Sequence, residues 1–220
     1  MIVVQERFNG PPNSGNGGYT CGLVAAAYGA NEVTLRTPPP LDTPLDVRED
    51  GVYAGDTLIA TPAQATVDVE PPPFPGYDAA LAARGRYRGL RDHPFPTCFV
   101  CGPHRDDGLD LRPGPVGDAL VATTWTPRDS SPETIWSALD CPGAWALMQT
   151  DEAPIVLGRL AVHVDKAPQE GRPHVVVGWR HKPREGRKHY AGTALYDAAG
   201  TLLARGQAVW VALSSSSGAS

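Results

Sequence analysis

The chain contains two apolar segments without a polar face, 19–28 and 143–148. In the shorter segments around them, apolar and polar positions alternate. The stretch 131–151 around the second of them contains two helix starts. Ser131-Pro132-Glu133 is typical of an N-cap, a first-turn proline and a first-turn acid. Asp140-Cys141-Pro142 is a second start, because proline is not tolerated inside a continuing helix. We therefore predict a short helix, a break, and a buried second helix running to about Thr150.

The first apolar segment, 19–28, is also predicted to be a buried helix, with Asn16 as its N-cap and Gly29 as its C-cap. Alternating segments around both helices carry strand signals. A turn at 197–200 joins the last two of these segments. The predicted strands are 2–4, 33–36, 45–48, 51–60 and 65–69 in the first half, and 119–125, 155–164, 174–181, 190–196 and 202–213 in the second.

The order strand, loop, buried helix and antiparallel strands thus occurs twice, which favours two similar modules. Thr57-Leu58-Ile59-Ala60 and Thr201-Leu202-Leu203-Ala204 hold the same place in each, with Val67 and Val211 in step behind them. We predict an α+β chain with one module at 1–70, a proline-rich linker with a connecting helix at 71–96, a second module at 97–213 and a disordered tail at 214–220. The two sheets are expected to meet edge to edge, because this covers exposed strand edges.

Composition narrows the functional classes. The chain has 220 residues, 41% of them hydrophobic, and a formal net charge of -5. That charge argues against nucleic acid as a partner, since phosphate binding needs a basic field. Its apolar segments are shorter than the roughly 20 residues that span a bilayer, so no membrane partner is expected. The start lacks the features of a targeting segment and the four cysteines are too few for a disulfide scaffold, so we predict a cytoplasmic protein.

Three places in the sequence resemble a known family. They are Phe8-Asn9-Gly10-Pro11-Pro12 followed by Asn16-Gly17-Gly18-Tyr19, then Cys98-Phe99-Val100-Cys101-Gly102-Pro103 with Gly108-Leu109, and the closing segment 192–213. Together they are similar to the acyl-CoA thioesterase-like proteins that carry two hotdog modules in one chain. The resemblance implies a double hotdog fold, in which a curved antiparallel sheet wraps a central helix twice over.

The resemblance also implies a site. Thioester hydrolysis builds negative charge on the carbonyl oxygen, and free backbone N–H groups at a helix start can hold it. Gly17, Gly18 and Gly143 leave that approach open, although glycines here would equally let a helix pack closely on a sheet. The polar group that the family carries about two turns into the helix is missing from Leu23-Val24-Ala25. In the second copy that region holds Gln149 and Asp151, and Asn16 and Cys141 replace the histidine usual before the glycine pair.

The candidate catalytic residues are Asp140, as the group that positions water, and Asn16, as the group that orients the thioester. The alternative for both is an N-cap that satisfies backbone N–H groups. Because paired hotdog modules bind their ligand where the helix start of one faces the other, 13–19 and 136–143 are expected to line one region. The expected substrate-binding residues are Asn13, Gly17, Gly18, Tyr19, Trp136, Cys141 and Gly143.

Three further motifs have two readings each. Cys98-x-x-Cys101 with His93 and His104 has zinc-ligand types, but a single pair is weak, and a metal-free tight turn is expected. Cys141 is either a nucleophile at a helix start or a buried small hydrophobe. The basic run 181–189 either receives coenzyme A phosphates or is a solvated hairpin loop. No cofactor and no metal are expected.

Two functions remain open from the sequence, and whether the protein is an enzyme is not decided. The first is hydrolysis of acyl-CoA thioesters. The alternative is an acyl-CoA or acyl-chain binding module that has lost turnover, which the apolar first helix favours. A hydratase acting on an enoyl thioester would need an aspartate and a histidine in one pocket, and no such spacing occurs. Acyl-CoA or a related thioester is the expected partner, and a homodimer is left open.

Overall fold

The computed structural model describes residues 1–149 and 154–213. Its helical elements are η1 (Glu6–Phe8), α1 (Gly17–Tyr28), α2 (Tyr77–Ala83), η2 (Arg84–Arg86), η3 (Arg88–Leu90), α3 (Pro132–Ala138) and α4 (Cys141–Met148). Its strands are β1 (Ile2–Val3), β2 (Glu32–Leu35), β3 (Pro44–Arg48), β4 (Gly51–Ala54), β5 (Thr57–Ala63), β6 (Gly114–Gly117), β7 (Leu120–Trp125), β8 (Ile155–Val164), β9 (His174–Glu185), β10 (Lys188–Asp197) and β11 (Leu202–Ala212). Thr150, Asp151 and the tail 214–220 lie outside the described residues. No described helix is long and apolar enough to cross a membrane.

One antiparallel sheet of 11 strands organises the chain, in the order β1-β3-β4-β5-β2-β8-β11-β10-β9-β7-β6. The two halves have the same strand connectivity when each is read outward from the centre of the sheet. The order is β2-β5-β4-β3-β1 in the first half and β8-β11-β10-β9-β7 in the second, and β6 is an additional edge strand. The halves join where β2 pairs with β8, with Val33 opposite Leu160. Both the α+β class and the edge-to-edge meeting of the two sets of strands are confirmed.

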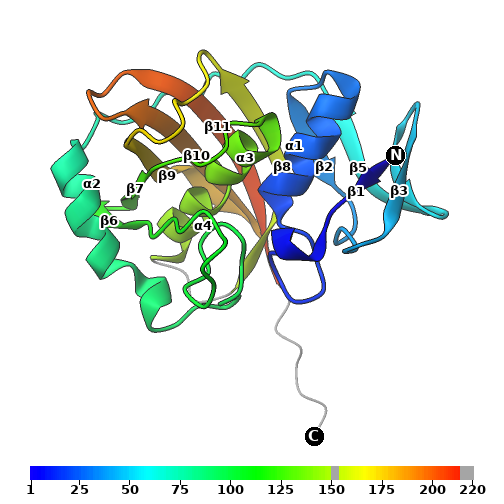
Figure 1. Cartoon of the computed structure of the whole chain (residues 1–220), viewed down its shortest axis with the longest axis horizontal. Coiled ribbons are helices and arrows are strands. Elements are labelled where there is room, and N and C mark those ends of the chain that lie inside the picture. Colours follow the sequence, from blue (N-terminus) through cyan, green and yellow to red (C-terminus); the bar gives the residue numbers. More distant parts are fainter. Residues whose placement is uncertain (150–153, 214–220) are drawn as a thin grey trace, which may run out of the picture.

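Helices α1, α3 and α4 lie on one face of this sheet (Figure 1). The predicted break is present, since α3 ends at Ala138 and α4 begins at Cys141 with Pro142 in its first turn. Every residue of α4 is buried, as its apolar sequence predicts. Helix α1 also begins and ends as predicted, because Asn16 Oδ1 accepts a hydrogen bond from the Tyr19 N–H and Gly29 closes the helix in the left-handed region.

Helices α1 and α3 cross at very short range through two glycines of α1. A Cβ atom on Gly22 would lie 2.5 Å from Cα of Glu133, and one on Gly18 would lie 2.8 Å from the carbonyl oxygen of Trp136. Only glycine permits this approach, which brings the start of α1 against the α3–α4 break.

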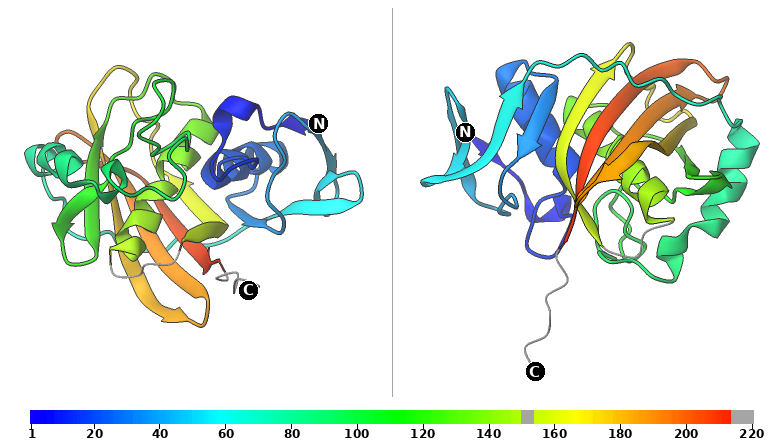
Figure 2. Two further views of the ribbon diagram at one scale, coloured as in Figure 1. Left: turned by 90° about the horizontal axis from the view of Figure 1, so that it is seen from below. Right: turned by 180° about the vertical axis from the view of Figure 1, so that it is seen from behind.

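Two strand predictions need correction. The segment 51–60 is not one strand but the hairpin of β4 and β5. The segment 65–69 forms no strand: it runs as extended chain behind the second half of the sheet, between β5 and α2 (Figure 2). Val67 and Val69 are buried against β9 on the face opposite α4, so their alternation reflects packing on a sheet surface and not a ladder. The equivalence of Val67 with Val211 was therefore wrong.

The proline-rich segment 71–96 connects the halves and contributes side chains to the core. Its connecting helix is α2, whose Ala80 and Ala83 are fully buried, and Tyr87 is 1% exposed. The Tyr87 hydroxyl donates to the carbonyl oxygen of Cys101 at 3.0 Å. This segment thereby supports the loop that carries the cysteine pair.

The helix crossing gives the first testable prediction. Gly22→Ala should lower the free energy of unfolding by about 1–3 kcal/mol, because its new methyl group would meet the backbone of α3, which cannot move aside cheaply. Gly85→Ala is the matched control, since a Cβ atom there meets nothing within 4 Å. Urea denaturation of both variants is the measurement. A Gly22→Ala protein as stable as the control would contradict the close crossing.

Candidate active site

The two predicted catalytic residues meet where the start of α1 faces the α3–α4 break. Asn16 Nδ2 donates to Asp140 Oδ2 at 3.0 Å, although 124 positions separate the two residues. The N–H of Gly18 donates to the same carboxylate oxygen, also at 3.0 Å. Asp140 precedes α4 but makes no side-chain capping bond to it. Its carboxylate instead caps α1 of the other half, together with Asn16.

Asp140 is a buried ionisable residue, with only 2% of its surface exposed to solvent. Burial raises the pKa of Asp140 to about 7, and the hydrogen bonds from the Gly18 N–H and from Asn16 act in the opposite direction. Oδ2 is occupied by these two donors, whereas Oδ1 has no hydrogen-bond partner among the described residues. One carboxylate oxygen therefore fixes the group, and the other is buried without a hydrogen bond from the described residues.

Asp140 borders a cavity of about 510 Å³ between the two halves of the chain. Its walls are mostly apolar. They come from loops of the first half, from the segment 93–101, and from α4, β8 and β11 of the second half. Asn16, Gly17, Asp140 and Cys141 lie in this wall. The apolar wall includes Pro11, Pro12, Leu35, Pro39, Trp145, Met148, Ile155, Leu157 and Trp210.

Five of the predicted binding residues lie outside this wall. Asn13 is exposed in the loop before α1, with a φ of 61°. The Tyr19 ring stacks on Phe8, with ring centroids 3.8 Å apart. Gly18 and Trp136 are buried in the crossing of α1 with α3.

Gly143 is the fifth residue, and it faces the sheet. A Cβ atom on it would lie 3.0 Å from Cβ of Ala191 and 3.3 Å from Cγ2 of Thr193, both on β10. Its N–H donates to the carbonyl oxygen of Asp140 at 3.1 Å. The alternative reading, in which this glycine lets a helix pack on the sheet, is the one that the structure supports.

Other residues of the wall had no signal in the sequence. Trp145, Leu157 and Trp210 are ordinary apolar positions of a helix and two strands, and only the strand order brings them to one cavity. The Nε1 atom of Trp210 is buried without a hydrogen-bond partner among the described residues. It is a further polar atom beside the cavity.

The three cysteines near the site gather in one place. Cys98 and Cys101 form a tight turn, as predicted, in which the Gly102 N–H donates to the Cys98 carbonyl oxygen at 2.9 Å. Cys141 joins them, with its Sγ 3.8 Å from that of Cys98. All three are buried, and the confirmed burial of Cys141 fits the small-hydrophobe reading.

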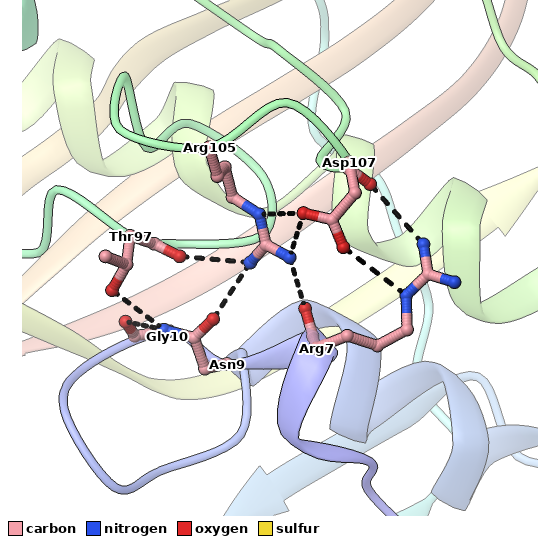
Figure 3. Close-up of polar contacts among 6 residues, drawn as sticks. All are labelled: Arg7, Asn9, Gly10, Thr97, Arg105 and Asp107. Carbon is pink, nitrogen blue, oxygen red and sulfur yellow. Dashed lines mark hydrogen bonds and ion pairs between the residues drawn. The ribbon is translucent and has the colours of Figure 1, made fainter.

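Arg105 ties the cysteine loop to the chain that leads into α1 (Figure 3). Its guanidinium donates to Asn9 Oδ1 at 2.8 Å, to the Thr97 carbonyl oxygen at 3.0 Å and to the Arg7 carbonyl oxygen at 2.8 Å. It also pairs with Asp107 at 2.6 Å. This fork links Cys98, the residue after Thr97, to the segment 7–9. The Asn16 N–H donates to the Phe8 carbonyl oxygen of that segment at 2.7 Å.

A second hollow, of about 710 Å³, lies beside this clamp and is lined by charged groups. Four of its five arginines have carboxylate partners: Arg7 and Arg105 pair with Asp107, and Arg84 and Arg112 pair with Asp110. The apolar cavity with the partner-free oxygen of Asp140 is therefore the stronger candidate.

Comparison with known proteins identifies the fold. No family model and no curated protein matches the sequence. Among solved structures, a candidate thioesterase from Novosphingobium aromaticivorans aligns over 97% of this chain and 94% of its own, with a TM-score of 0.60 and 12% identity. A candidate thioesterase II from Thermobifida fusca aligns over 92% and 88%, with a TM-score of 0.59 and 14% identity.

The TesB protein of Mycobacterium avium subspecies paratuberculosis aligns over 93% of this chain and 89% of its own, with a TM-score of 0.55 and 11% identity. The chain has the double hotdog fold. Such similarity confirms the predicted fold. At these identities the similarity concerns the fold alone, because one fold hosts many different chemistries.

The clamp around Arg105 gives the second prediction. Arg105→Ala should lower the free energy of unfolding by about 2 kcal/mol, because three acceptors lose a charged donor. Arg91→Ala, at an exposed position, should change it by less than about 0.5 kcal/mol. Thermal and urea denaturation measure both. Equal stability of the two variants would show that the clamp does not hold the loop.

Proposed function

We propose that this protein hydrolyses acyl-CoA thioesters, with the acyl chain in the apolar cavity and Asp140 positioning the attacking water. The observation that carries the proposal is the partner-free Oδ1 of a buried carboxylate in the wall of that cavity. A cavity of about 510 Å³ has the size of a small-molecule site. In the reaction, the water oxygen bonds to the thioester carbonyl carbon and the C–S bond breaks. One proton of the water passes to the sulfur, which leaves as the free thiol, and the acyl group leaves as the carboxylic acid.

The start of α1 supplies a donor for the developing oxyanion. The N–H groups of Gly18, Tyr19 and Thr20 donate to Asp140, to Asn16 Oδ1 and to the Asn16 carbonyl oxygen. The Gly17 N–H has no partner among the described residues, and Gly17 lies in the cavity wall. It therefore takes the role expected of the glycine pair, strengthened by the positive end of the helix dipole. Asn16 holds Asp140 in place and does not itself need to meet the substrate.

One cationic side chain lies in the cavity wall and a second is the strand partner of a wall residue, which suits the phosphates of coenzyme A. Arg36 is exposed and lies in the wall. Lys188, on the β9–β10 hairpin, pairs in register with Val211, another wall residue. These positions support the phosphate-binding reading of the basic run 181–189, since Lys and Arg recognise phosphate through charge-assisted hydrogen bonds.

Two broader proposals accompany this one. The matching strand connectivity of the two halves supports an origin by duplication of one module. The four free cysteines, Cys21, Cys98, Cys101 and Cys141, support the reducing environment of the cytoplasm.

The second candidate function is a binding module without turnover. One feature of the Asp140 carboxylate favours it. Asp140 Oδ2 already caps α1 across the helix crossing, so a structural role alone would explain its burial among donors. The two candidates differ in what the free Oδ1 does.

Asp140→Asn separates them and is the third prediction. The asparagine oxygen still accepts from Gly18 and Asn16, so the fold should persist, whereas thiol release from a panel of acyl-CoA substrates should fall about a hundredfold or more. Asp129→Asn is the matched control, because Asp129 also accepts hydrogen bonds at a helix start, from Ser131 and Thr134, but lies outside the cavity. Its turnover should stay near that of the unchanged protein.

Equal turnover in the Asp140 and Asp129 variants would remove Asp140 from the mechanism. Acyl-CoA binding by the unchanged protein without any thiol release would instead support the binding module.

The fourth prediction concerns Arg36. Arg36→Ala should raise KM for acyl-CoA about two- to fivefold, since it removes one exposed ionic contact. It should leave kcat unchanged, as well as KM for the acyl-N-acetylcysteamine thioester, which lacks the phosphates. Arg128→Ala, in the second hollow, is the control. An effect of equal size on both thioesters would contradict a phosphate contact.

A further inference from the structure

The three sulfurs beside the cavity have the spacing of a metal site. The Sγ atoms of Cys98, Cys101 and Cys141 all lie within 4.8 Å of one another, and those of Cys98 and Cys141 are 3.8 Å apart. Tetrahedral zinc with Zn–S bonds of about 2.3 Å holds its sulfurs roughly 3.8 Å apart. The thiols are therefore close to the arrangement that one zinc ion requires, with little movement needed.

The turn that presents the first two sulfurs is built around Gly102. A Cβ atom at this position would lie 2.5 Å from the Cys98 nitrogen and 2.6 Å from the Cys98 carbonyl oxygen. A tight Cys-x-x-Cys-Gly turn, closed by the hydrogen bond from the Gly102 N–H to the Cys98 carbonyl oxygen, presents both side chains to one ligand.

Side-chain donors surround the same sulfurs. His93 Nε2 lies 3.3 Å from Cys101 Sγ, and the Phe95 N–H donates to His93 Nδ1 at 2.9 Å. The ring proton is therefore on Nε2 and points at the sulfur. Asn16 Nδ2 lies 3.8 Å from Cys98 Sγ. Such N–H donors suit negatively charged thiolates, and hydrogen bonds of this kind tune metal-bound sulfur.

We propose that Cys98, Cys101 and Cys141 bind one zinc ion as thiolates, with the fourth coordination position facing the apolar cavity. All three residues line that cavity, so the open position is reachable from it. Thiolate ligands select zinc over magnesium or calcium, which prefer oxygen. Binding releases the thiol protons to solvent, and the net charge of -1 from three thiolates and one Zn²⁺ is offset by the N–H donors.

This proposal replaces the expectation of a metal-free cysteine pair. That expectation counted two thiols on one loop, whereas the third is 43 positions after Cys98 and comes from the first residue of α4. It does not depend on the proposed thioester hydrolysis.

The test is metal content. Protein purified without chelator, incubated with Zn²⁺ and desalted, should contain about one zinc per chain by inductively coupled plasma mass spectrometry. Cys98→Ser, Cys101→Ser and Cys141→Ser should each contain far less than one. Cys21→Ser is the matched control, because Cys21 is a fully buried free cysteine outside the cluster, and it should retain the metal.

Circular dichroism identifies any variant that does not fold, and the unchanged protein supplies an independent measurement. Co²⁺ in place of zinc should give intense thiolate-to-cobalt charge-transfer absorption. Folded, reduced protein that takes up neither Zn²⁺ nor Co²⁺, or equal zinc in the serine variants and the Cys21 control, would overturn the proposal. Because none of these readouts requires turnover, their failure is distinct from failure of the proposed function.

Discussion

The site depends on one carboxylate oxygen that serves two halves of the chain. Asp140 Oδ2 accepts from the Gly18 N–H and from Asn16 Nδ2 on the far side of a helix crossing. A buried acceptor with two donors is stabilised as long as both remain in place, and a missing acceptor would leave two buried donors unsatisfied at a cost of about 1–3 kcal/mol each. The helix start of one half is thus completed by a side chain of the other, and the cavity forms at this junction.

The surrounding architecture makes that contact possible. Pairing of β2 with β8 fuses the two sets of strands, and the glycines of α1 let α3 approach until backbone meets backbone. Asp140 and Cys141 are neighbours at the α3–α4 break. Asp140 contacts the start of α1, and Cys141 lies in the sulfur cluster. Arg105 holds the cysteine loop from the opposite side, so that the carboxylate and the thiols share one wall.

Local signals in the sequence sufficed where the structure is determined locally. Asn16, Gly29 and Pro142 mark helix ends through their own backbone chemistry, and those ends were predicted correctly. Val67 and Val69 were misread because alternation shows that one side of the chain is buried, not that a neighbouring strand is present. Period-two burial is common to strands and to extended chain lying on a sheet.

The site was predictable in part for the same reason. Asp140 and Asn16 stood out as polar residues at helix starts, but whether a cap serves its own helix or another depends on the crossing. The sequence left open whether Gly143 faces a ligand or the sheet, since a glycine shows that something approaches closely but not what approaches. The cysteine cluster and the apolar wall combine residues from distant elements, and the strand order that unites them has no local signature.

A crystal structure with a thioether analogue of an acyl-CoA, in which a methylene separates the carbonyl group from sulfur, tests the central claim most directly. The claim is that the cavity between the halves holds the acyl chain with its carbonyl group at the start of α1. The account predicts the chain against Pro39 and Leu157, and the carbonyl oxygen within about 3.2 Å of the Gly17 nitrogen. An acyl chain bound outside this cavity, or a carbonyl group out of reach of both Gly17 and Asp140, would contradict it.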